Sequence, residues 1–527
     1  MSESRPPVEP LPVARQLRDL VARLAAAGRA PGLRVDGRPA PSEAIATVEV
    51  SGVTQDSRAV RPGDLFVAIA GTRFDGHDLA ERAIGRGAAA LLVERPLPGV
   101  AAPQVIVEST RRALATAAAW WFGDPSRQLT VIGVTGTDGK TTTCYLAVAA
   151  LEAAGRRTGL IGTIATRIGG QTLDHAAHAT TPEAPELQAA LRAMIEAGDD
   201  CAVIETTSHG LALDRVAEVD YDVAILTNLT HEHLELHGTW EAYRDAKVSL
   251  FSRLGGPTTA AVINLDDTNA GAFIGAAREV GARVITYGTE PSADIHAIRV
   301  SEDARGLHAT LETPRGQASL DLRLAGRFNI HNAMAVVALG EALDLDDELV
   351  RSGMAGLERV PGRMERIDLG QPFGVVVDFA HSPASLAAVL DLLAPAAAAA
   401  GGGLIAVFGS AGERDTAKRS QMGRIAGERC RLVIVTDEDP RGEDRMAILD
   451  EIASGAESTG RRRGHDLLLI PDRRTAIEAA IDAARPGDVV LLAGKGHERS
   501  IIGADGETPW DERAVAEAVL AGVIDRL

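Results

Sequence analysis

The segment from Val131 to Thr142 constrains the fold more than any other part of the chain. An apolar run, VIGV, passes directly into the glycine-rich sequence TGTDGK and then into TTT and an apolar stretch. A strand, a glycine-rich turn and a helix N-terminus together make an anion site, because backbone N–H groups and the helix dipole converge on phosphate oxygens. Lys140 would reach the outer phosphates of ATP, and the Thr141 hydroxyl would bind Mg²⁺.

The loop departs from the strict GxxxxGK[ST] pattern by one position, since Val134 stands where the first glycine would fall and the glycine is Gly133. The alternative is a glycine-rich turn with an exposed lysine. The GKTTT sequence directly after an apolar strand favours an ATP-binding loop. Its expected contacts are Gly136, Thr137, Asp138, Gly139, Lys140, Thr141 and Thr142.

Strand-like and helix-like segments alternate through most of the chain, which favours an α/β fold with parallel sheets. Strand-like runs lie at 130–134, 202–204, 223–226 and 260–263, and a second block has them at 375–377, 404–408, 432–435 and 489–492. Residues 290–325 alternate apolar and polar side chains, which predicts a small antiparallel extension. Boundaries near 125 and 360 give domains 1–125, 126–360 and 361–527, in line with about one domain per 150 residues.

Residues 1–40 form an N-terminal extension in this scheme. Val13, Leu17, Leu20, Val21 and Leu24 fall on one helical face, which predicts a short amphipathic helix.

Composition excludes several classes of protein. The chain has 54 basic and 73 acidic residues, a net charge of −19, and only 3% aromatic residues. These values argue against nucleic acid or an acidic membrane as the main partner. Three cysteines are too few for a disulfide framework, the N-terminus lacks a signal-peptide pattern, and no apolar run is long enough to span a membrane. We expect a soluble, cytoplasmic protein, with a monomer as the default state.

Two further predicted strands end in polar residues. Glu205 closes the run AVIE, where a carboxylate either caps the next loop or holds a cation; beside a phosphate loop we favour a cation. The segment after the next strand contains His231, His233 and His237. Three histidines can indicate zinc, but no cysteine lies nearby and the position suits Mg²⁺-phosphate chemistry better. Any one of these histidines is more often a satisfied polar residue.

These segments together resemble the Mur ligase family, and within it the ligases that add a diamino acid to UDP-N-acetylmuramoyl-L-alanyl-D-glutamate. The resemblance covers about residues 51–520. The family's TGTNGKTT, ExSSHG and NLxxDHLDxHG segments appear as TGTDGKTT at 135–142, ETTSHG at 205–210 and NLTHEHLELHG at 228–238. The resemblance implies three α/β domains: an N-terminal uridine-binding domain, a central ATPase domain and a C-terminal Rossmann-like domain.

The resemblance also implies the metal-binding and catalytic residues. EAYRDAK at 241–247 matches the family's ExYxxAK, whose lysine is typically carbamylated and binds a second Mg²⁺, so Lys247 inherits that role. By itself Lys247 would be interpreted as a surface helix lysine. A carbamate can ligate Mg²⁺, whereas an ammonium cannot. One Mg²⁺ is expected at Thr141 and a second at Glu205, His233 and carbamylated Lys247, and the expected catalytic residues are Lys140, Glu205, His233 and Lys247.

The resemblance also implies which residues contact ATP and which contact the UDP-dipeptide. FNIHN at 328–332, GRME at 362–365 and DFAHSP at 378–383 match the family's adenine, ribose and phosphate contacts. The resemblance therefore implies that ATP is bound by Asn329, His331, Asn332, Arg363, Asp378 and His381. DSRAVRPGDLFVA at 56–68 resembles the segment that holds the UDP end. The expected contacts of the UDP-dipeptide are Ser57, Arg58, Thr180, Thr181, Thr207 and Arg215.

Three C-terminal segments match the family's amino acid pocket. FGSAGERD at 408–415 would place Arg414 on the α-carboxylate of the incoming amino acid, and AGKGHE at 493–498 would place Gly494 and Glu498 at its side-chain end. The third, EDPR at 438–441, stands where meso-diaminopimelate ligases have DNPR, so Glu438, Asp439 and Arg441 are expected contacts.

Two residues of the EDPR segment, Asp439 and Arg441, favour different incoming amino acids. Arg441 suits a bidentate grip on a distal carboxylate, which diaminopimelate has and lysine or ornithine lacks. Asp439 would repel that carboxylate and attract an ammonium; if it pairs with Arg441 instead, the pocket would suit L-lysine or L-ornithine. Because the Arg441 guanidinium suits a distal carboxylate, we favour meso-diaminopimelate as the amino acid.

The expected activity is ATP-dependent amide ligation through an acyl phosphate, in peptidoglycan precursor synthesis. Departures from the family pattern at Asp138, Glu232, Glu235 and Ser410-Ala411 leave open a paralogue that binds nucleotide without catalysis. The C-terminal motifs disfavour two other members of the superfamily, the alanyl-alanine-adding ligase and folylpolyglutamate synthase.

Overall fold

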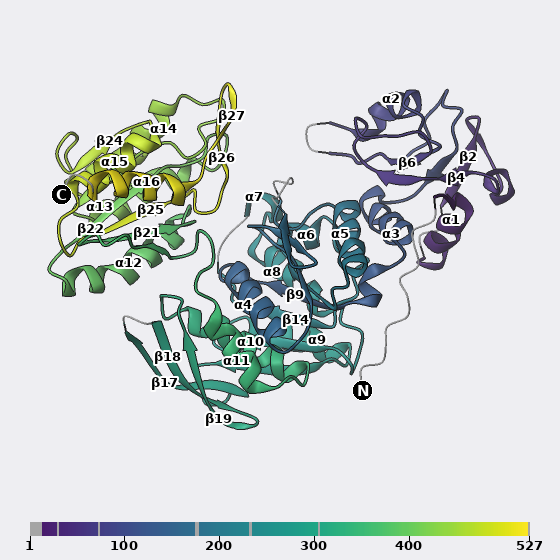
Figure 1. Ribbon diagram of the computed structural model, residues 1–527. Helices are drawn as coiled ribbons and strands as arrows, with labels where there is room; N and C mark the ends of the chain where they lie inside the picture. The colour runs from purple at the N-terminus through teal and green to yellow at the C-terminus, as the bar shows by residue number, and fades with distance from the viewer. Residues whose placement is uncertain are drawn as a thin grey trace. The chain divides into compact units, whose positions relative to one another are not determined.

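The computed structural model describes residues 13–28, 31–71, 74–173, 179–230, 234–303 and 306–524 (Figure 1). The chain divides into two compact units. One consists of Met1–Ser301, His308–Asp321 and Phe328–Gly356, and the other of Glu302–Leu307, Leu322–Arg327 and Leu357–Leu527. No helix among the described residues is long and apolar enough to cross a membrane.

The N-terminal part of the first unit contains a six-stranded sheet in the order β3-β2-β8-β7-β6-β5. Its strands are β2 (Gly32–Val35), β3 (Arg38–Pro39), β5 (Gly52–Thr54), β6 (Asp64–Val67), β7 (Ala90–Val93) and β8 (Gln104–Ile106), and β1 (Arg15–Gln16) pairs with β4 (Glu49–Val50) apart from it. The helices are α1 (Leu17–Ala26), α2 (Ala80–Gly85), α3 (Thr110–Phe122) and the 3₁₀ turns η1 (Ser42–Ile45), η2 (Gly76–Leu79) and η3 (Pro125–Gln128).

The predicted amphipathic helix is confirmed as α1, with one correction. Leu17, Leu20, Val21 and Leu24 are buried in one core, whereas Val13 lies before the helix and is 91% exposed. The chain at 15–16 pairs as strand β1 instead, so the helical face begins only at Leu17.

The larger sheet of the first unit has eleven strands in the order β12-β11-β10-β13-β9-β14-β15-β16-β17-β18-β19. The strands are β9 (Thr130–Thr135), β10 (Thr158–Ile161), β11 (Thr166–Ile168), β12 (Gln171–Leu173), β13 (Cys201–Glu205), β14 (Val223–Leu226), β15 (Ala260–Asn264), β16 (Arg283–Gly288), β17 (Ile295–Asp303), β18 (Gly306–Thr313) and β19 (Gly316–Leu322). Strands β10, β13, β9, β14, β15 and β16 pair in parallel, which confirms the α/β prediction.

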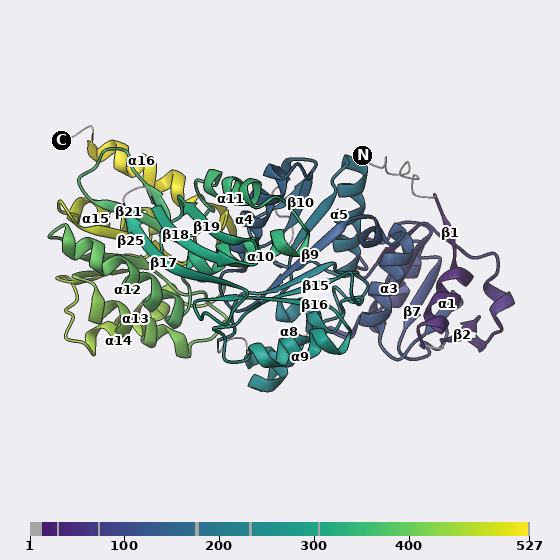
Figure 2. The same ribbon diagram turned by 90° about the horizontal axis from the view of Figure 1, so that it is seen from below.

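Helices cover both faces of this sheet (Figure 2). They are α4 (Lys140–Ala153), α5 (Ala184–Ala197), α6 (Ser208–Ala212), α7 (Leu234–His237), α8 (Trp240–Phe251), α9 (Ala270–Glu279), α10 (Asn329–Ala342) and α11 (Asp347–Gly356). Side chains of α5, α8 and α9 pack with alternate residues of β9, β13, β14 and β15 in one core, and α4, α10 and α11 pack together elsewhere. Burial on both faces explains why these strands are almost wholly apolar.

The antiparallel extension expected within residues 290–325 is β17, β18 and β19, which continue the sheet beyond β16. Residues 314 and 315 alone connect β18 to β19, and so short a connection can join only antiparallel strands.

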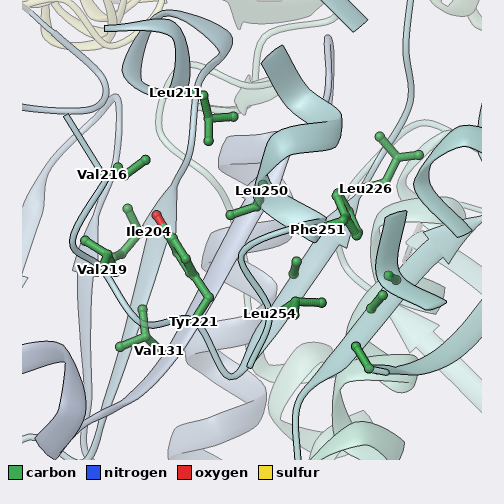
Figure 3. Packing of buried hydrophobic residues seen from close by; sticks show 14 of the residues in the cluster. Val131, Ile204, Leu211, Val216, Val219, Tyr221, Leu226, Leu250, Phe251 and Leu254 are labelled. Carbon is green, nitrogen blue, oxygen red and sulfur yellow. The ribbon is translucent and has the colours of Figure 1, made fainter. Parts of the chain in front are cut away.

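Gly133, in the middle of β9, has a packing role. A Cβ at this position would lie 2.6 Å from Cε1 of Tyr221. Figure 3 shows the Tyr221 ring among Val131, Ile204 and Leu250, and its hydroxyl lies 3.1 Å from Oγ1 of Thr206. The absent side chain at Gly133 therefore makes room for a buried ring.

The second unit contains a six-stranded sheet in the order β20-β21-β25-β22-β23-β24, with a separate hairpin of β26 and β27. Its elements are β20 (Glu365–Ile367), β21 (Gly374–Asp378), α12 (Pro383–Ala399), β22 (Leu404–Phe408), α13 (Ala417–Arg429), β23 (Leu432–Val435), α14 (Arg445–Glu457), β24 (Leu467–Leu469), α15 (Arg473–Ala483), β25 (Val489–Ala493), β26 (Ser500–Gly503), β27 (Gly506–Pro509) and α16 (Glu512–Ile524). Side chains of α12, α13 and α14 share one core with this sheet, and those of α15 and α16 share the other.

Strands β21, β25, β22, β23 and β24 are mutually parallel. Their carboxyl ends therefore meet at one edge of the sheet, where ligand sites of open α/β sheets occur. Helix α12 ends at Ala399, within the Ala-rich run 394–400, and Gly401 follows with a positive φ. Cys144, Cys201 and Cys430 are buried and form no disulfide, in line with the expectation that three cysteines do not make a disulfide framework.

Candidate functional site

The phosphate-binding loop lies at the carboxyl end of β9, between β13 and β14. Strand register pairs Val134 with Glu205 on one side and Thr135 with Leu226 on the other. The sheet order therefore brings the end of β13 next to the start of the loop.

The loop is held by the segment after β14. Gly136 has φ of +148°, and a Cβ there would lie 1.9 Å from Oγ1 of Thr227, so only glycine fits. Thr227 Oγ1 donates to the Asp138 carbonyl at 2.6 Å, and the Asp138 N–H donates to Asn228 Oδ1 at 2.9 Å. Because these contacts use the Asp138 backbone and its side chain is exposed, the exchange of Asn for Asp leaves them intact.

Two lysines converge on a single carbonyl of the loop. Lys140 Nζ donates to the carbonyl oxygens of Gly136 at 3.1 Å and Thr137 at 2.6 Å. Lys247 Nζ donates to the same Gly136 oxygen at 2.6 Å and lies 4.8 Å from the ring centroid of Tyr243. The interpretation of Lys247 as a surface lysine is wrong: it is 2% exposed, because α8 packs its buried face under the loop.

Glu205 is fully buried, and three donors surround its carboxylate. Thr141 Oγ1 donates to Oε2 at 3.1 Å, and Thr163 donates its N–H to Oε1 at 3.0 Å and its hydroxyl to Oε2 at 2.8 Å. The carboxylate and the Thr141 hydroxyl form an oxygen donor set of the kind Mg²⁺ takes in nucleotide sites. Thr163 was not predicted: it follows β10 in a loop without a signal, and only the pairing of β10 with β13 brings it here.

Residues expected to contact the UDP-dipeptide gather around Glu205. Thr181 Oγ1 donates to the Glu205 carbonyl at 2.7 Å and lies 2.9 Å from Thr207 Oγ1, and Thr180 Oγ1 lies 3.0 Å from Thr163 Oγ1. Arg215 donates to the Thr181 carbonyl at 2.8 Å. The N-terminal contacts lie elsewhere in this unit: Ser57 is buried, and Arg58 is exposed and paired with Asp56 at 2.9 Å.

The predicted metal ligand His233 lies outside the described residues, together with His231 and Glu232. His237 is described: its ring contacts His209 at 5.8 Å and Tyr243 at 5.4 Å between centroids. Across the described part of the chain, no three His, Cys, Asp or Glu side chains cluster in a way that could hold a metal ion.

The residues expected to contact the adenine of ATP lie at the start of α10; they are Asn329, His331 and Asn332. Asn332 ties this helix to α4, because its Oδ1 accepts from Thr143 Oγ1 at 3.3 Å and its amide donates to Asn329 at 2.8 Å. His331 Nε2 lies 2.9 Å from Asp266 Oδ2. Burial raises the pKa of Asp266, but hydrogen bonds from His331 and Thr289 outweigh it and hold that pKa below its ordinary value.

In the second unit, Asp378 is the last residue of β21. Its carboxylate joins the GRME and DFAHSP segments, which are expected to contact ribose and phosphate. Its carboxylate accepts N–H bonds from Met364 and Ala380, both at 2.8 Å. Burial raises the pKa of Asp378, while the nearby Arg363 charge opposes the shift. The Arg363 guanidinium lies 4.8 Å above the ring of Phe379, and His381 Nδ1 lies 2.9 Å from the Phe379 carbonyl.

The EDPR segment follows β23, and Asp439 does not pair with Arg441. Asp439 Oδ1 instead accepts from the fully buried Lys495 Nζ at 2.8 Å and from the Ile502 N–H at 2.9 Å. The hypothesis of an Asp439–Arg441 pair is therefore wrong. Lys495, inside the AGKGHE segment, was not singled out from the sequence. Its ammonium is shared between Asp439 and Glu498, so it offsets part of the charge that would repel a distal carboxylate.

The other expected pocket residues of this unit divide between buried and open positions. Glu438 is 6% exposed, and its Oε2 has no hydrogen-bond partner among the described residues. Gly494 adjoins it: a Cβ there would lie 3.0 Å from that oxygen. Glu498 pairs with Lys495 at 2.5 Å, and burial raises the pKa of Glu498. Arg414 is exposed on the loop after β22.

Arg441 has an uncommon backbone conformation for a residue other than glycine. Its φ is +53°, and its N–H donates to the Ile502 carbonyl at 2.8 Å. No carboxylate of the described chain forms an ion pair with its guanidinium, whose buried Nε has no hydrogen-bond partner. The Arg441 guanidinium is therefore not bound to a carboxylate among the described residues of its own unit.

The comparisons with known proteins agree with this arrangement. Residues 134–340 match the family model of the Mur ligase middle domain, 362–496 that of the Mur ligase glutamate ligase domain, and 49–121 that of the Mur ligase family catalytic domain. The chain is 49% identical to a UDP-N-acetylmuramyl-tripeptide synthetase of Roseiflexus sp. (strain RS-1) over 90% of this chain and 95% of that one.

Two further relatives carry a more specific name. A UDP-N-acetylmuramoyl-L-alanyl-D-glutamate–2,6-diaminopimelate ligase of Bacillus velezensis is 41% identical over 85% of this chain and 90% of its own. A solved structure of a ligase with that name matches with a TM-score of 0.63 and 30% identity, over 91% of this chain and 96% of the other.

The chain belongs to the Mur ligase family and has its three-domain α/β fold. Members of this family are ATP-dependent ligases that form C–N bonds, and the chain is an enzyme of that class, with a place in peptidoglycan synthesis.

Proposed function

We propose that the chain joins a diamino acid to the D-glutamate of UDP-N-acetylmuramoyl-L-alanyl-D-glutamate at the expense of ATP. The observation that carries the proposal is the meeting of Lys140, Lys247, Thr141 and Glu205 at one phosphate loop, with Thr180, Thr181, Thr207 and Arg215 beside it. Phosphoryl-transfer groups and substrate-binding groups thus share the carboxyl edge of one sheet. The names of the relatives support the choice of acceptor.

Amide formation from a carboxylate and an amine is uphill in water, so the carboxylate must first be activated. An oxygen of the D-glutamyl carboxylate attacks the γ-phosphorus of ATP, and ADP leaves. The amine, having lost a proton, then attacks the acyl carbon, and inorganic phosphate leaves. Both steps concentrate negative charge, so cations and N–H donors contribute most to catalysis. In this chain those groups are the loop amides and Lys140, whose ammonium already lies folded over the loop.

One Mg²⁺ would be held at Thr141, and a second by Glu205, His233 and Lys247 as a carbamate. Bound there, the second ion would screen the attacking carboxylate from the phosphate charge. Carbamylation replaces the Lys247 ammonium with an anionic oxygen ligand. The donation of Lys247 to the Gly136 carbonyl at 2.6 Å belongs to the unmodified side chain.

The amino acid pocket favours meso-diaminopimelate over L-lysine or L-ornithine. Lys495 pairs with both Asp439 and Glu498, so its one ammonium offsets part of the charge of the carboxylate that most opposed this choice. Arg441 keeps its guanidinium free of carboxylate partners within its described unit, which leaves the fork for a distal carboxylate of the ligand. Arg414 would bind the α-carboxylate, and Glu438, Gly494 and Glu498 would lie at the other end.

The proposed function assigns a role to each of the three predicted domains. We assign residues 1–125 to the UDP-binding domain, 126–360 to the ATP-binding domain and 361–527 to the amino acid-binding domain. ATP contacts would come from Gly136–Thr142, Asn329, His331, Asn332, Arg363, Asp378 and His381. Ser57 and Arg58 would hold the UDP end, and the enzyme would act as a cytoplasmic monomer.

Phosphate release tests the proposal directly. We expect release that requires ATP, Mg²⁺, the UDP-dipeptide and a diamino acid together, with meso-diaminopimelate, L-lysine and L-ornithine compared side by side. Turnover with lysine or ornithine alone would refute the choice of amino acid and leave the ligase standing. Nucleotide binding without release for any diamino acid would favour a non-catalytic paralogue.

Replacing Arg441 tests the choice of amino acid. We expect Arg441→Ala to raise the KM for meso-diaminopimelate about 10- to 100-fold, because one charge-assisted bidentate contact is lost, and to change the KM for ATP little. Arg441→Lys keeps the charge without the fork and should fall between. Steady-state kinetics on the two variants measure this. An unchanged KM for diaminopimelate in Arg441→Ala would remove Arg441 from the pocket.

A further inference from the structure

Arg473 is a buried charge that the proposed mechanism does not use. It is the first residue of α15, and its side chain is fully buried. The guanidinium pairs with Glu512, which is also fully buried, through Nε at 2.9 Å and a terminal nitrogen at 2.6 Å. Trp510 Nε1 donates at 2.6 Å to Glu512 Oε2, the oxygen that also accepts from Arg473 Nε.

The same guanidinium also binds two backbone carbonyls from different strands. One terminal nitrogen donates to the Asp437 carbonyl at 3.0 Å, and the other donates to the Ala493 carbonyl at 2.8 Å. Asp437 follows β23 and Ala493 ends β25, and these strands are not neighbours, because β22 lies between them. Arg473 therefore spans three strands at the carboxyl edge of the sheet.

The Asp437 carbonyl immediately precedes the EDPR segment, and the Ala493 carbonyl belongs to the first residue of the AGKGHE segment. Asp437 is followed by Glu438 and Asp439, and Ala493 by Gly494 and Lys495. A second tie joins the same two segments farther along, through Lys495 Nζ and Asp439 Oδ1 at 2.8 Å. The spacing between the segments is thus set twice, once through backbone oxygens and once through side chains.

We propose that Arg473 is a positioning residue that sets the separation of the two segments forming the amino acid pocket. The inference rests on the proposed function for the identity of that pocket. Its physical ground is that a planar guanidinium binds two carbonyls and, through two N–H groups, a carboxylate at once in a fixed geometry, whereas a lysine has only three donors on a flexible stem. A buried ion pair adds little stability by itself compared with apolar packing, so these contacts act through geometry.

The chain offers a matched control at the opposite edge of the same strands. Arg431 and Asp488 form an ion pair just before β23 and β25, and the Asp488 carboxylate also accepts from the Gly403 N–H at 2.8 Å, just before β22. Arg431 also binds a backbone carbonyl, that of Ala483, at 2.7 Å. A lysine there disturbs the same strands away from the pocket segments.

Full-length Arg473→Lys, Arg431→Lys and wild-type protein are compared by kinetics and hydrogen–deuterium exchange. We expect Arg473→Lys to raise the KM for meso-diaminopimelate about 10- to 100-fold, with the KM for ATP and kcat changed much less, since small displacements of binding groups have effects of this size. Amides in 437–441 and 494–502 should exchange faster in Arg473→Lys than in Arg431→Lys. Equal KM values and equal exchange in the two variants would overturn the proposal.

A double variant separates positioning from stability. Arg473→Met with Glu512→Leu replaces the buried pair by apolar side chains, a change that is often neutral for stability. Here the Asp437 and Ala493 carbonyls and Trp510 Nε1 lose these partners, so we expect a lower melting temperature. Measured well below that temperature, the KM and the exchange of the two segments should still be raised. A stable double variant with wild-type KM and exchange would show a merely structural role. Exchange requires no turnover, so its result stands even if wild-type protein makes no tripeptide, an outcome that refutes only the proposed function.

Discussion

Lys247→Ala should lower tripeptide formation by at least about 100-fold, a loss typical of removing a group that stabilises developing charge. The side chain lies 2% exposed under the phosphate loop, 2.6 Å from the Gly136 carbonyl and against the Tyr243 ring. Because it is buried, alanine also leaves a cavity, and we expect a loss of about 1–3 kcal/mol in the free energy of unfolding. Phosphate release and a thermal melt, measured on the same preparation, separate the two effects.

Two controls test the carbamate itself. Lys247→Arg keeps a cation near the loop, but a guanidinium stays protonated and does not take up CO₂, so it should be as inactive as alanine. Acetate or formate added to Lys247→Ala should restore part of the activity, since the cavity admits a small carboxylate where the carbamate would lie. Full activity of either variant in a tripeptide-forming assay would refute the assignment of Lys247.

Lys140→Met should lower the rate of phosphate release about 100- to 1000-fold, while the protein stays folded. Lys140 Nζ is held by the Gly136 and Thr137 carbonyls at 3.1 and 2.6 Å, so its ammonium lies over the loop before any phosphate is bound. The side chain is only partly buried, and methionine keeps most of its volume, so the melting temperature should change little.

Lys140→Arg distinguishes charge from fit in the same assay. It keeps the positive charge in a wider group, so we expect activity between that of the wild type and that of Lys140→Met. Calorimetric titration with ATP shows how much of the loss lies in binding. Phosphate release within about threefold of the wild type in Lys140→Met would exclude the proposed role, since one ordinary exposed contact contributes that little.

Local sequence determined the phosphate loop and the strand pattern. The run VIGV followed by TGTDGKTT specified β9, the loop and the start of α4, because the strand, the turn and the helix N-terminus are contiguous. Alternating apolar runs likewise predicted the parallel strands, since burial on both faces leaves little room for polar residues. Family motifs then indicated Glu205, Lys247 and the pocket segments before any contact was visible.

Tertiary structure decided how the charges of these residues are compensated. Glu205 meets Thr163 only because β10 pairs with β13, and Lys247 is buried only because α8 packs beneath the loop. Asp439 meets Lys495 and not the nearby Arg441, since the ends of β23 and β25 lie along one edge of the sheet. Sequence patterns identify which residue types a segment offers, whereas the partner of a buried charge depends on strands far apart in the chain, which only the folded sheet brings together.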